Sequence, residues 1–348
     1  MKKNNIKNSL IPVGIMLLAV IVFVMVILDM TGGKTEQVTK STVAMGTVVT
    51  EKLYGKGIDE KTFDKIEKTV SELENEISWR IDGSKISTLN KNGSVECGKE
   101  LEDVFSSCKE VYTKSGGAFD ITMGKVTSLW KIGEEDAAVP DGKTLENALS
   151  FVDGSSVVSS NGKITVKNGQ FIDLGAVGKG LACDKIREAL KETDVGGAVV
   201  SVGGSVLLYG KNPTSDSWTV AIRDPRGESG DTVGKLKIDG GVVSTSGDYE
   251  RVLTVGDKKY HHILDPKTGY PADSGLISVT VVCDSGLLSD ALSTAAFVMG
   301  LDGGAKLLAQ FGAQGVFIDK DKNVFVTDGL SDKFTLTADG YTLSGDVK

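Results

Sequence analysis

The spacing of hydrophobic positions changes about halfway along this chain. Before residue 115, apolar side chains recur at intervals of three and four, which is typical of helices with one buried face. One such stripe, with charged residues opposite, consists of Phe63, Ile66, Val70, Leu73 and Ile77. A second helix is expected over residues 99–115, before the stop signal Gly116-Gly117, with inward positions Val104, Phe105, Cys108, Val111 and Tyr112.

Beyond residue 155 the pattern becomes one of short strands separated by turn residues. Residues 163–174 predict a hairpin, because Asn168-Gly169 tolerates the positive φ angles of a tight turn. Other strands are expected at 41–49, 198–202, 206–209, 218–223, 242–245, 249–255, 278–283 and, as a closing pair, within 315–326. Helices are expected at 181–192, 285–299 and 303–311. Few helices and mostly consecutive strands predict an α+β fold, a single domain of mixed, largely antiparallel sheets with packed helices.

The N-terminal segment has a different character from the rest of the chain. Residues 9–28 carry no charge and follow Lys2, Lys3 and Lys7, and as a helix they would span about 30 Å, enough to cross a bilayer. A cleaved signal peptide is the alternative, but its apolar stretch is usually shorter and ends in small residues. Basic residues before the helix favour an N-terminus inside the cell. We therefore expect a single-pass protein of the cell membrane, with a cytoplasmic tail at 1–8, a transmembrane anchor at 9–28, a linker at 29–40 and an extracytoplasmic domain at 41–348.

Composition narrows the classes of partner. A net charge of −8, without any run of Lys or Arg, argues against nucleic acid as a ligand. An anionic ligand would therefore need positive charge concentrated locally. The four cysteines, which lack metal-type spacing and predict no zinc site, are Cys97, Cys108, Cys183 and Cys283. The sequence leaves open whether Cys97 pairs with Cys108 or both are buried free thiols.

The chain contains only two histidines, the adjacent pair His261-His262. Histidine is the side chain whose ordinary pKa lies nearest neutrality, so this segment alone can supply imidazole proton transfer. It is expected to be a strand that runs into a turn at Asp265-Pro266, so that His262 and His261 point to opposite faces. At most one of them can serve a given site. The alternative is that both are ordinary polar residues at the end of a strand.

Asp290 and Thr294 form a second candidate pair. On a helix, positions i and i+4 lie on one face, so a carboxylate and a hydroxyl would point together. Two such oxygen donors suit Mg²⁺, which also takes carbonyl oxygens, water and substrate phosphates. The structural alternatives are that Thr294 bonds back to a carbonyl one turn earlier and that Asp290 complements the helix N-terminus.

A third candidate is the glycine-rich segment 173–180, between a strand and a helix. Glycines allow close approach of a ligand, and a helix start offers N–H donors to phosphate. The segment matches neither the Walker pattern nor the dinucleotide fingerprint, and a tight structural turn explains it equally well. Hydroxyl-rich or basic segments of the same ambiguous kind are Ser201–Ser205, Arg223–Pro225 and Ser244–Asp248.

Taken together, these segments resemble the ApbE-like flavin transferases. The motifs that carry the resemblance occur in the family's order, and they are Met45-Gly46-Thr47, Gly117–Gly124, Asp173–Gly180, Ser201–Ser205, Arg223–Pro225, Ser244–Asp248, His262–Pro266 with Thr268-Gly269, and Asp290–Thr294. The likeness spans nearly all of the chain outside the expected anchor. Two departures concern Lys125, where relatives often carry proline, and Ser205, where they commonly carry Asn or Asp.

The resemblance implies a Mg²⁺-dependent FAD:protein FMN transferase with an ApbE-like catalytic domain. Such an enzyme moves the FMN half of FAD to a Thr or Ser hydroxyl of a partner protein and releases AMP. The implied FAD contacts are Met45, Trp79, Ala118, Phe119, Asp120, Asp173, Lys179, His262 and Ile263. The implied metal ligands are the Ala176 carbonyl, the Asp290 carboxylate and the Thr294 hydroxyl.

These residues suggest roles in the implied reaction. Lys179 and the metal would stabilise charge on the diphosphate, with Asp290 catalytic through the metal. His262 is the candidate general base, and Asp248 is a weaker one. The implied partners are flavin-carrying subunits, such as those of Rnf- or Nqr-type redox complexes. The alternatives are a hydrolase that splits FAD into FMN and AMP, and a flavin-binding protein without turnover.

Overall fold

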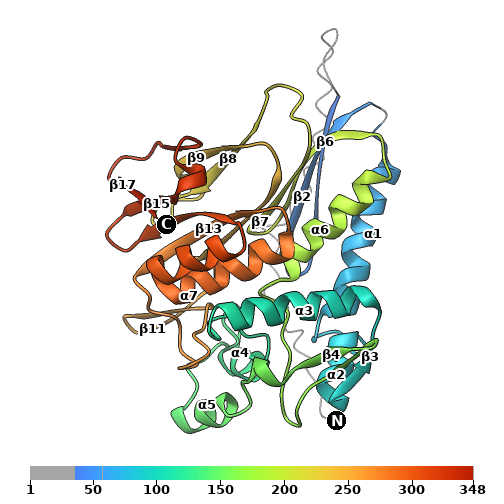
Figure 1. Ribbon diagram of the computed structural model, residues 1–348, viewed down its shortest axis with the longest axis vertical. Helices are drawn as coiled ribbons and strands as arrows, with labels where there is room; N and C mark the ends of the chain where they lie inside the picture. The colour runs from blue at the N-terminus through green and yellow to red at the C-terminus, as the bar shows by residue number, and fades with distance from the viewer. Residues whose placement is uncertain (1–35, 57, 348) are drawn as a thin grey trace, which may run out of the picture.

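A nine-stranded sheet forms the framework of the protein, seen here in a computed structural model that describes residues 36–347 apart from residue 57 (Figure 1). Neighbouring strands are antiparallel except for the last pair, which is parallel. Their order across the sheet is β1 (Gln37–Ala44), β2 (Thr47–Gly55), β6 (Val195–Val202), β7 (Ser205–Gly210), β10 (Gly241–Gly247), β13 (Leu276–Cys283), β14 (Gln314–Asp319), β15 (Asn323–Thr327) and β17 (Thr342–Val347).

Helices cover one face of this sheet, and they include α1 (Glu60–Ile77), α6 (Gly178–Lys191) and α7 (Gly286–Gln310), with α3 (Lys99–Lys114) packed against α7 (Figure 1). The predicted stripe of α1 is buried as expected, and so are four of the five inward positions of α3, while Tyr112 is partly exposed. The two helices expected at 285–299 and 303–311 are the two parts of α7, which breaks at Gly300 with φ at 78°. The apolar patterns therefore identified the main helices.

A small sheet covers the opposite face and consists of β8 (Trp218–Arg223), β9 (Thr232–Ile238) and β16 (Phe334–Leu336). Alternation along the large sheet separates two cores: Leu207 packs with the helices, whereas Leu208 packs with Trp218 and Leu236 of the small sheet. The remaining elements are α2 (Lys85–Asn92), β3 (Ser94–Glu96), α4 (Gly124–Trp130), α5 (Gly142–Leu149), β4 (Val158–Ser160), β5 (Lys163–Thr165), β11 (Val252–Val255) and β12 (Lys258–His261). The prediction of a mixed, largely antiparallel α+β fold is confirmed.

Two strand predictions were wrong, and tight turns explain both. Residues 41–49 do not form one strand, because Met45 and Gly46, with φ of 52° and 66°, make the turn between β1 and β2. The expected hairpin at 163–174 is also absent from the described structure. Asn168-Gly169 does make a turn, with φ of 85° at Gly169, but no strand of the described structure follows it directly, and the hairpin is formed at Asn161-Gly162, with φ of 54° and 73°, which joins β4 to β5.

The segment after β5 finds a side-chain partner in place of a strand. The Asn90 amide accepts a hydrogen bond from the Ile172 N–H at 2.7 Å and donates one to the Ile172 carbonyl at 2.9 Å. One side chain thus satisfies both backbone groups that a neighbouring strand would have paired. A long-range contact of this kind leaves no local signal in the sequence.

Helices α6 and α7 cross through a contact between two glycines. A Cβ on Gly180 would lie 1.9 Å from the Gly286 carbonyl oxygen, and one on Gly286 would lie 2.1 Å from the Gly180 oxygen. Each helix also supplies an aspartate to the other's first turn. Asp184 accepts from the Gly286 N–H at 2.8 Å, and Asp290 accepts from the Gly180 N–H at 2.6 Å. Any side chain at the crossing would break this mutual capping.

The structure bears on the expected membrane anchor and linker and on the state of the cysteines. Within the described residues, no helix is long and apolar enough to span a bilayer, and the expected tail and anchor at 1–28 lie outside those residues. Strand β1 begins at Gln37, within the expected linker at 29–40. All four cysteines are free thiols.

We predict that Gly286→Ala destabilises the protein by about 3 kcal/mol, because the added methyl group would overlap the Gly180 carbonyl at the helix crossing. Chemical denaturation of both proteins would measure this difference. The matched control is Gly142→Ala in the first turn of α5, where a Cβ meets no atom within 4 Å and stability should be unchanged or slightly higher. Equal stability of Gly286→Ala and the wild type would contradict the tight crossing.

Candidate active site

The Asp290 carboxylate lies at the crossing of α6 and α7 and is only 5% exposed. Its Oδ2 atom accepts from the Gly180 N–H at 2.6 Å, and its Oδ1 atom accepts from the Ser205 hydroxyl at 2.5 Å. Each oxygen keeps a lone pair beyond these bonds, since a carboxylate offers about four acceptor positions. The buried carboxylate is therefore held in place and can still coordinate a cation.

Thr294 lies one turn further along α7, and its Oγ1 is 3.4 Å from the Ser246 hydroxyl of β10. No bond from Thr294 to an earlier carbonyl occurs among the hydrogen bonds of the described residues. Ser293 makes that kind of bond instead, donating to the Asp290 carbonyl at 2.9 Å, and it also contacts Ser246 at 2.8 Å. The Thr294 hydroxyl thus remains free to bind another group.

The Ala176 carbonyl completes a set of oxygen donors. In a regular helix it would accept from the Gly180 N–H, but that N–H donates to Asp290 instead. Within the described part of the chain, no other donor bonds to this carbonyl. Ala176 lies just before α6, so its unpaired oxygen belongs to the same turn that holds Asp290.

These donors fit Mg²⁺ better than a transition metal. Carboxylate, hydroxyl and carbonyl oxygens are hard ligands, and Mg²⁺ completes its shell with water and substrate phosphates. The described residues contain no group of three His, Cys, Asp or Glu side chains that could hold a metal. A cation at this crossing would therefore depend on mixed oxygen donors and on the substrate.

Positive charge gathers beside the same crossing. Burial, and after it the charges of Arg251 and Lys179, lower the pKa of His262 to about 3, so both cations act on the imidazole. Lys179 is in the first turn of α6, whose N-terminus adds a positive dipole end, whereas the start of α7 is capped by the Asp184 carboxylate. An anionic ligand is favoured here despite the net charge of −8.

The two histidines have different neighbours, and strand β12 ends at His261, so that His262 lies just beyond it. His261 contacts the Ala272 carbonyl at 3.0 Å through Nε2 and packs edge-on against Phe297 at 5.5 Å between ring centroids. The backbone N–H of His262 donates to the Arg251 carbonyl at 3.2 Å. Within the described structure, the His262 Nδ1 atom has no hydrogen-bond partner. The His261 Nδ1 atom also lacks a partner there, but only His262 is acted on by the charges of Arg251 and Lys179.

Met45 brings the β1–β2 turn to the start of α6. Its backbone N–H donates to Glu74 of α1 at 3.0 Å, and a Cβ on Gly178 would lie 3.2 Å from the Met45 methyl group. The side chain therefore covers the first turn of α6, one residue from Lys179. This contact joins the N-terminal hairpin to the cluster.

Trp79 lies in the loop after α1 with an unused donor. Its ring packs edge-on against Phe171 at 5.1 Å between centroids, and the Arg80 guanidinium lies 4.1 Å above the ring. The buried indole Nε1 has no hydrogen-bond partner among the described residues. Since a buried tryptophan N–H usually finds a partner, this donor fits the role of a ligand contact.

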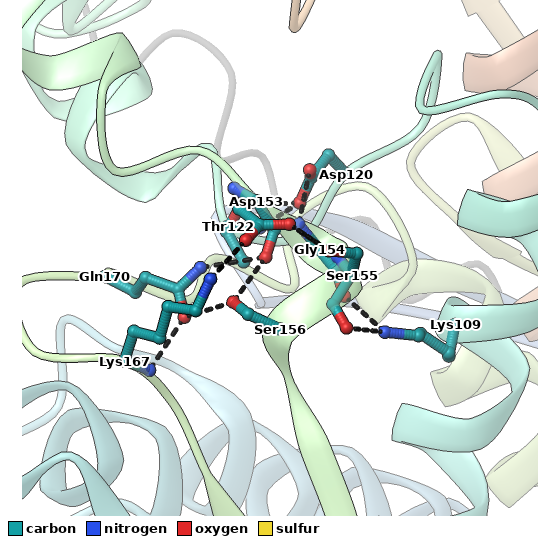
Figure 2. A network of polar contacts seen from close by, with 9 residues as sticks. All are labelled: Lys109, Asp120, Thr122, Asp153, Gly154, Ser155, Ser156, Lys167 and Gln170. Atoms are coloured by element: carbon teal, nitrogen blue, oxygen red, sulfur yellow. Dashed lines mark hydrogen bonds and ion pairs between the residues drawn. The ribbon is translucent and has the colours of Figure 1, made fainter.

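The segment Ala118–Asp120 is bound into its own loop. Ala118 and Phe119 are buried, and the Asp120 carboxylate accepts from the Thr122 N–H and hydroxyl at 2.8 and 2.7 Å and from the Gly154 N–H at 2.8 Å. Figure 2 shows this network and its continuation through Asp153. Burial is the main cause that raises the Asp120 pKa. Because these side chains have structural partners, contacts to a ligand would involve backbone groups.

Asp173 and Ile263 also have structural partners. The Asp173 carboxylate accepts from the Thr127 hydroxyl at 2.9 Å and from the Gly175 N–H at 2.8 Å, and its own N–H donates to the Ile121 carbonyl at 2.8 Å. That last bond places Asp173 next to the Ala118–Asp120 segment. Ile263 is buried in the main core. Asp173, at one end of the glycine-rich segment 173–180, thus lies beside the Ala118–Asp120 segment, and Gly180, at the other end, binds Asp290.

A cavity of about 260 Å³ lies between α3 and the Asp120 loop. It is lined by Asp120 together with Phe105, Cys108, Lys109 and Tyr112, among others, and by none of Lys179, His262 or Asp290. This mostly apolar cavity is a poorer site for an anion and a cation together than the helix crossing, which combines oxygen donors with positive charge.

Four residues of the cluster had no functional prediction of their own from the sequence. Arg251 lies beside His262 and Glu74 holds Met45, although neither belongs to a motif that was singled out. Ser246 belongs to a hydroxyl-rich segment, but its contact with Thr294 was not foreseen. Ser205 belongs to the hydroxyl-rich segment Ser201–Ser205 and departs from the family's usual residue, but its hydrogen bond to Asp290 was not predicted. Their roles depend on distant partners, which local sequence does not indicate.

The chain is similar to known flavin transferases over most of its length. A model of the ApbE family matches residues 45–317. A FAD:protein FMN transferase of Treponema pallidum is 31% identical over 323 residues, which cover 86% of this chain and 89% of that protein. One from Klebsiella pneumoniae is 28% identical over 308 residues, covering 86% and 95%. The crystal structure of the ApbE protein from Thermotoga maritima matches with a TM-score of 0.77 at 31% identity and covers 84% of this chain and 98% of that one. With its motifs, its fold and the oxygen donors at the crossing of α6 and α7, this chain belongs to the ApbE family.

Proposed function

We propose that this protein is a Mg²⁺-dependent FAD:protein FMN transferase. In the proposed reaction, the hydroxyl oxygen of a Thr or Ser in a partner protein bonds to the phosphorus of the FMN half. The bond of that phosphorus to the bridging oxygen breaks, AMP leaves, and the hydroxyl proton is released. The names of the relatives from Treponema pallidum and Klebsiella pneumoniae support the reaction class.

The observation that carries the proposal is the donor set at the helix crossing. Asp290, Thr294 and the unpaired Ala176 carbonyl offer three kinds of oxygen beside Lys179 and the N-terminus of α6. Cleavage of a diphosphate develops negative charge on its oxygens, and positive groups fixed in place lower that cost. A protein with a net charge of −8 has no general attraction for FAD, so this local charge is what would select it.

Each residue has a defined task in this proposal. Bound at these donors, Mg²⁺ would polarise the phosphoryl oxygens and stabilise the leaving AMP. Lys179 orients the diphosphate and balances its charge. Ser205 and the Gly180 N–H hold the Asp290 carboxylate in one orientation, so that it does not have to reorganise when the substrate binds.

His262 is the proposed base for the acceptor hydroxyl. Its lowered pKa keeps the ring neutral at ordinary pH and able to accept a proton, although a base with a pKa of about 3 is weak. The anionic diphosphate of bound FAD would offset Arg251 and Lys179 and raise this pKa toward neutrality. Asp248 is a poorer candidate, because both its oxygens bind the Arg226 guanidinium at 2.8 and 2.7 Å.

The acceptor and the location extend the same proposal. A membrane anchor at 9–28 would keep the catalytic domain on the outer side of the cell membrane, near membrane-bound flavin-carrying subunits such as those of Rnf- or Nqr-type redox complexes. The apolar length of the segment and the basic residues before it support this arrangement.

We predict that Thr294→Val slows FMN transfer by about 100-fold and weakens Mg²⁺ binding by at least about tenfold, because a methyl group replaces a hydroxyl donor of the same size. The matched control, Thr294→Ser, keeps the hydroxyl and should retain most activity. Intact-mass measurement of the acceptor after incubation with FAD and Mg²⁺, with calorimetric titration of Mg²⁺, checks both effects. Release of AMP and free FMN with an unmodified acceptor would instead indicate a hydrolase, and undiminished Mg²⁺ binding by the valine variant would contradict the metal assignment.

We predict that His262→Gln slows transfer by about 10²–10⁴-fold while FAD affinity changes far less, since general-base help acts mainly on the chemical step. Single-turnover kinetics and equilibrium titration with FAD separate the two effects. His261→Gln is the neighbouring control, and its transfer rate should remain near that of the wild type. A parallel loss of affinity and rate in His262→Gln would show that this residue only binds FAD.

The lowered pKa of His262 also predicts how stability depends on pH. Between the folded pKa of about 3 and the unfolded value near 6.5, the unfolded chain binds more protons at this residue. Its contribution to stability is therefore complete above about pH 6.5 and is lost on acidification, at up to about 1.4 kcal/mol per pH unit. Denaturation measured from about pH 7 to about pH 4 should show a shallower decline for His262→Gln than for the wild type. An unchanged decline would contradict a neutral, buried imidazole.

A further inference from the structure

Glu51 occupies a core position of strand β2. The inward face of this strand carries Val49, Glu51 and Leu53, and all three are buried, with Glu51 only 1% exposed. Strand alternation predicts an apolar residue there. A carboxylate that breaks the pattern between two aliphatic side chains suggests a function for this position.

The Glu51 carboxylate has no partner in the described structure. Neither oxygen accepts a hydrogen bond, and no described Lys, Arg or His forms an ion pair with it. Lys40 lies directly opposite on β1, but its ammonium group contacts Glu60 and Glu67 instead, both at 2.6 Å. Burial, and after it the charge of Glu67, raise the pKa of Glu51 to about 8.

An acidic cavity of about 400 Å³ opens beside this carboxylate, between the β1–β2 hairpin and α1. Its charged lining is Glu51, Asp64, Glu67, Glu74 and Lys68, and its apolar lining includes Ala44, Val49 and Val70. The Lys68 ammonium lies 3.7 Å from Glu72, which is not part of the lining. Four carboxylates thus share one cavity with a single lysine, and the most deeply buried of them, Glu51, has no partner among the described residues.

We propose that this cavity binds an organic cation, a primary ammonium or guanidinium group on an aliphatic stem, with Glu51 as its buried counter-ion. An N–H⁺ group would supply the hydrogen bonds that both Glu51 oxygens lack, and charge-assisted bonds of this kind are the strong ones. The apolar walls suit a methylene chain. The volume far exceeds that of a single ion, and the described residues offer no three-ligand metal group.

The cavity is separate from the donors at the helix crossing but shares a wall with the Met45 turn. Glu74 lines the cavity, and it also accepts the Met45 N–H at 3.0 Å. An occupied cavity would therefore meet the residue that covers the start of α6. Binding of the cation requires no flavin, so its test is independent of the proposed transferase reaction.

Calorimetric titration of the full chain with two amines tests the proposal. Spermidine represents a free amine, and N-acetyl-lysine methylamide represents a lysine of another protein. At about pH 9 at least one of them should bind saturably at one site, and the tighter of the two identifies the source. Because the cation must displace the Glu51 proton, affinity should fall about tenfold per pH unit below about pH 8. The same other charged groups face Glu51 at every pH of the titration, and they are Lys40, Asp64, Glu67, Lys68 and Glu74.

Glu51→Gln should weaken binding of the better amine by about tenfold or more and remove the pH dependence. Glutamine matches the shape of the protonated carboxyl group, so this variant should fold. The control is Glu76→Gln, on α1 but outside the cavity lining, which should bind like the wild type. Absence of saturable binding at about pH 9, equal affinity of Glu51→Gln and wild type, or an equal loss in Glu76→Gln would overturn the proposal. Should Glu51→Gln fail to fold, the pH dependence of the wild type decides alone.

Discussion

The close crossing of α6 and α7 is the constraint on which the site depends. Two glycines, Gly180 and Gly286, let the helix backbones touch, so that each helix can place an aspartate at the other's first turn. The two aspartates are used differently. Asp184 bonds two N–H groups of α7 and Arg187, whereas Asp290 takes one bond on each oxygen. One end of the crossing is therefore a structural cap, and the other retains capacity for a cation.

That crossing also explains how an acidic protein can attract an anionic substrate. The N-terminus of α6, Lys179 and Arg251 concentrate positive charge within one region, although the net charge is −8. Negative charge is concentrated elsewhere, in the cavity around Glu51. Both regions touch the Met45 turn, one through α6 and the other through Glu74. The turn between β1 and β2 thus lies between two sites of opposite charge.

Local sequence patterns correctly predicted the elements that local interactions determine, and they failed where distant partners decide the structure. The stripe on α1 was correct because burial of one helix face is repeated over eighteen residues. The hairpin at 163–174 was wrong because β5 pairs with β4 and β3, while the residues after the turn at Asn168-Gly169 bond to the distant Asn90 side chain. The strand at 41–49 was wrong for a related reason, since Met45 is a non-glycine residue that takes a positive φ of 52°.

The sequence by itself determined the fold class, the family and the place of Asp290 and Thr294 one turn apart on a helix, because periodicity and motif order are local properties. Only the tertiary structure decided which of the candidate groups remain available. Asp120 and Asp173 are used by their own loops, Asp248 is paired with Arg226, and the Ala176 carbonyl is left free because a distant aspartate takes its partner. The burial of Glu51 without a cationic partner in the described structure is apparent only in the folded chain. These outcomes depend on hydrogen bonds between residues far apart in the sequence, and such bonds form only when the chain packs.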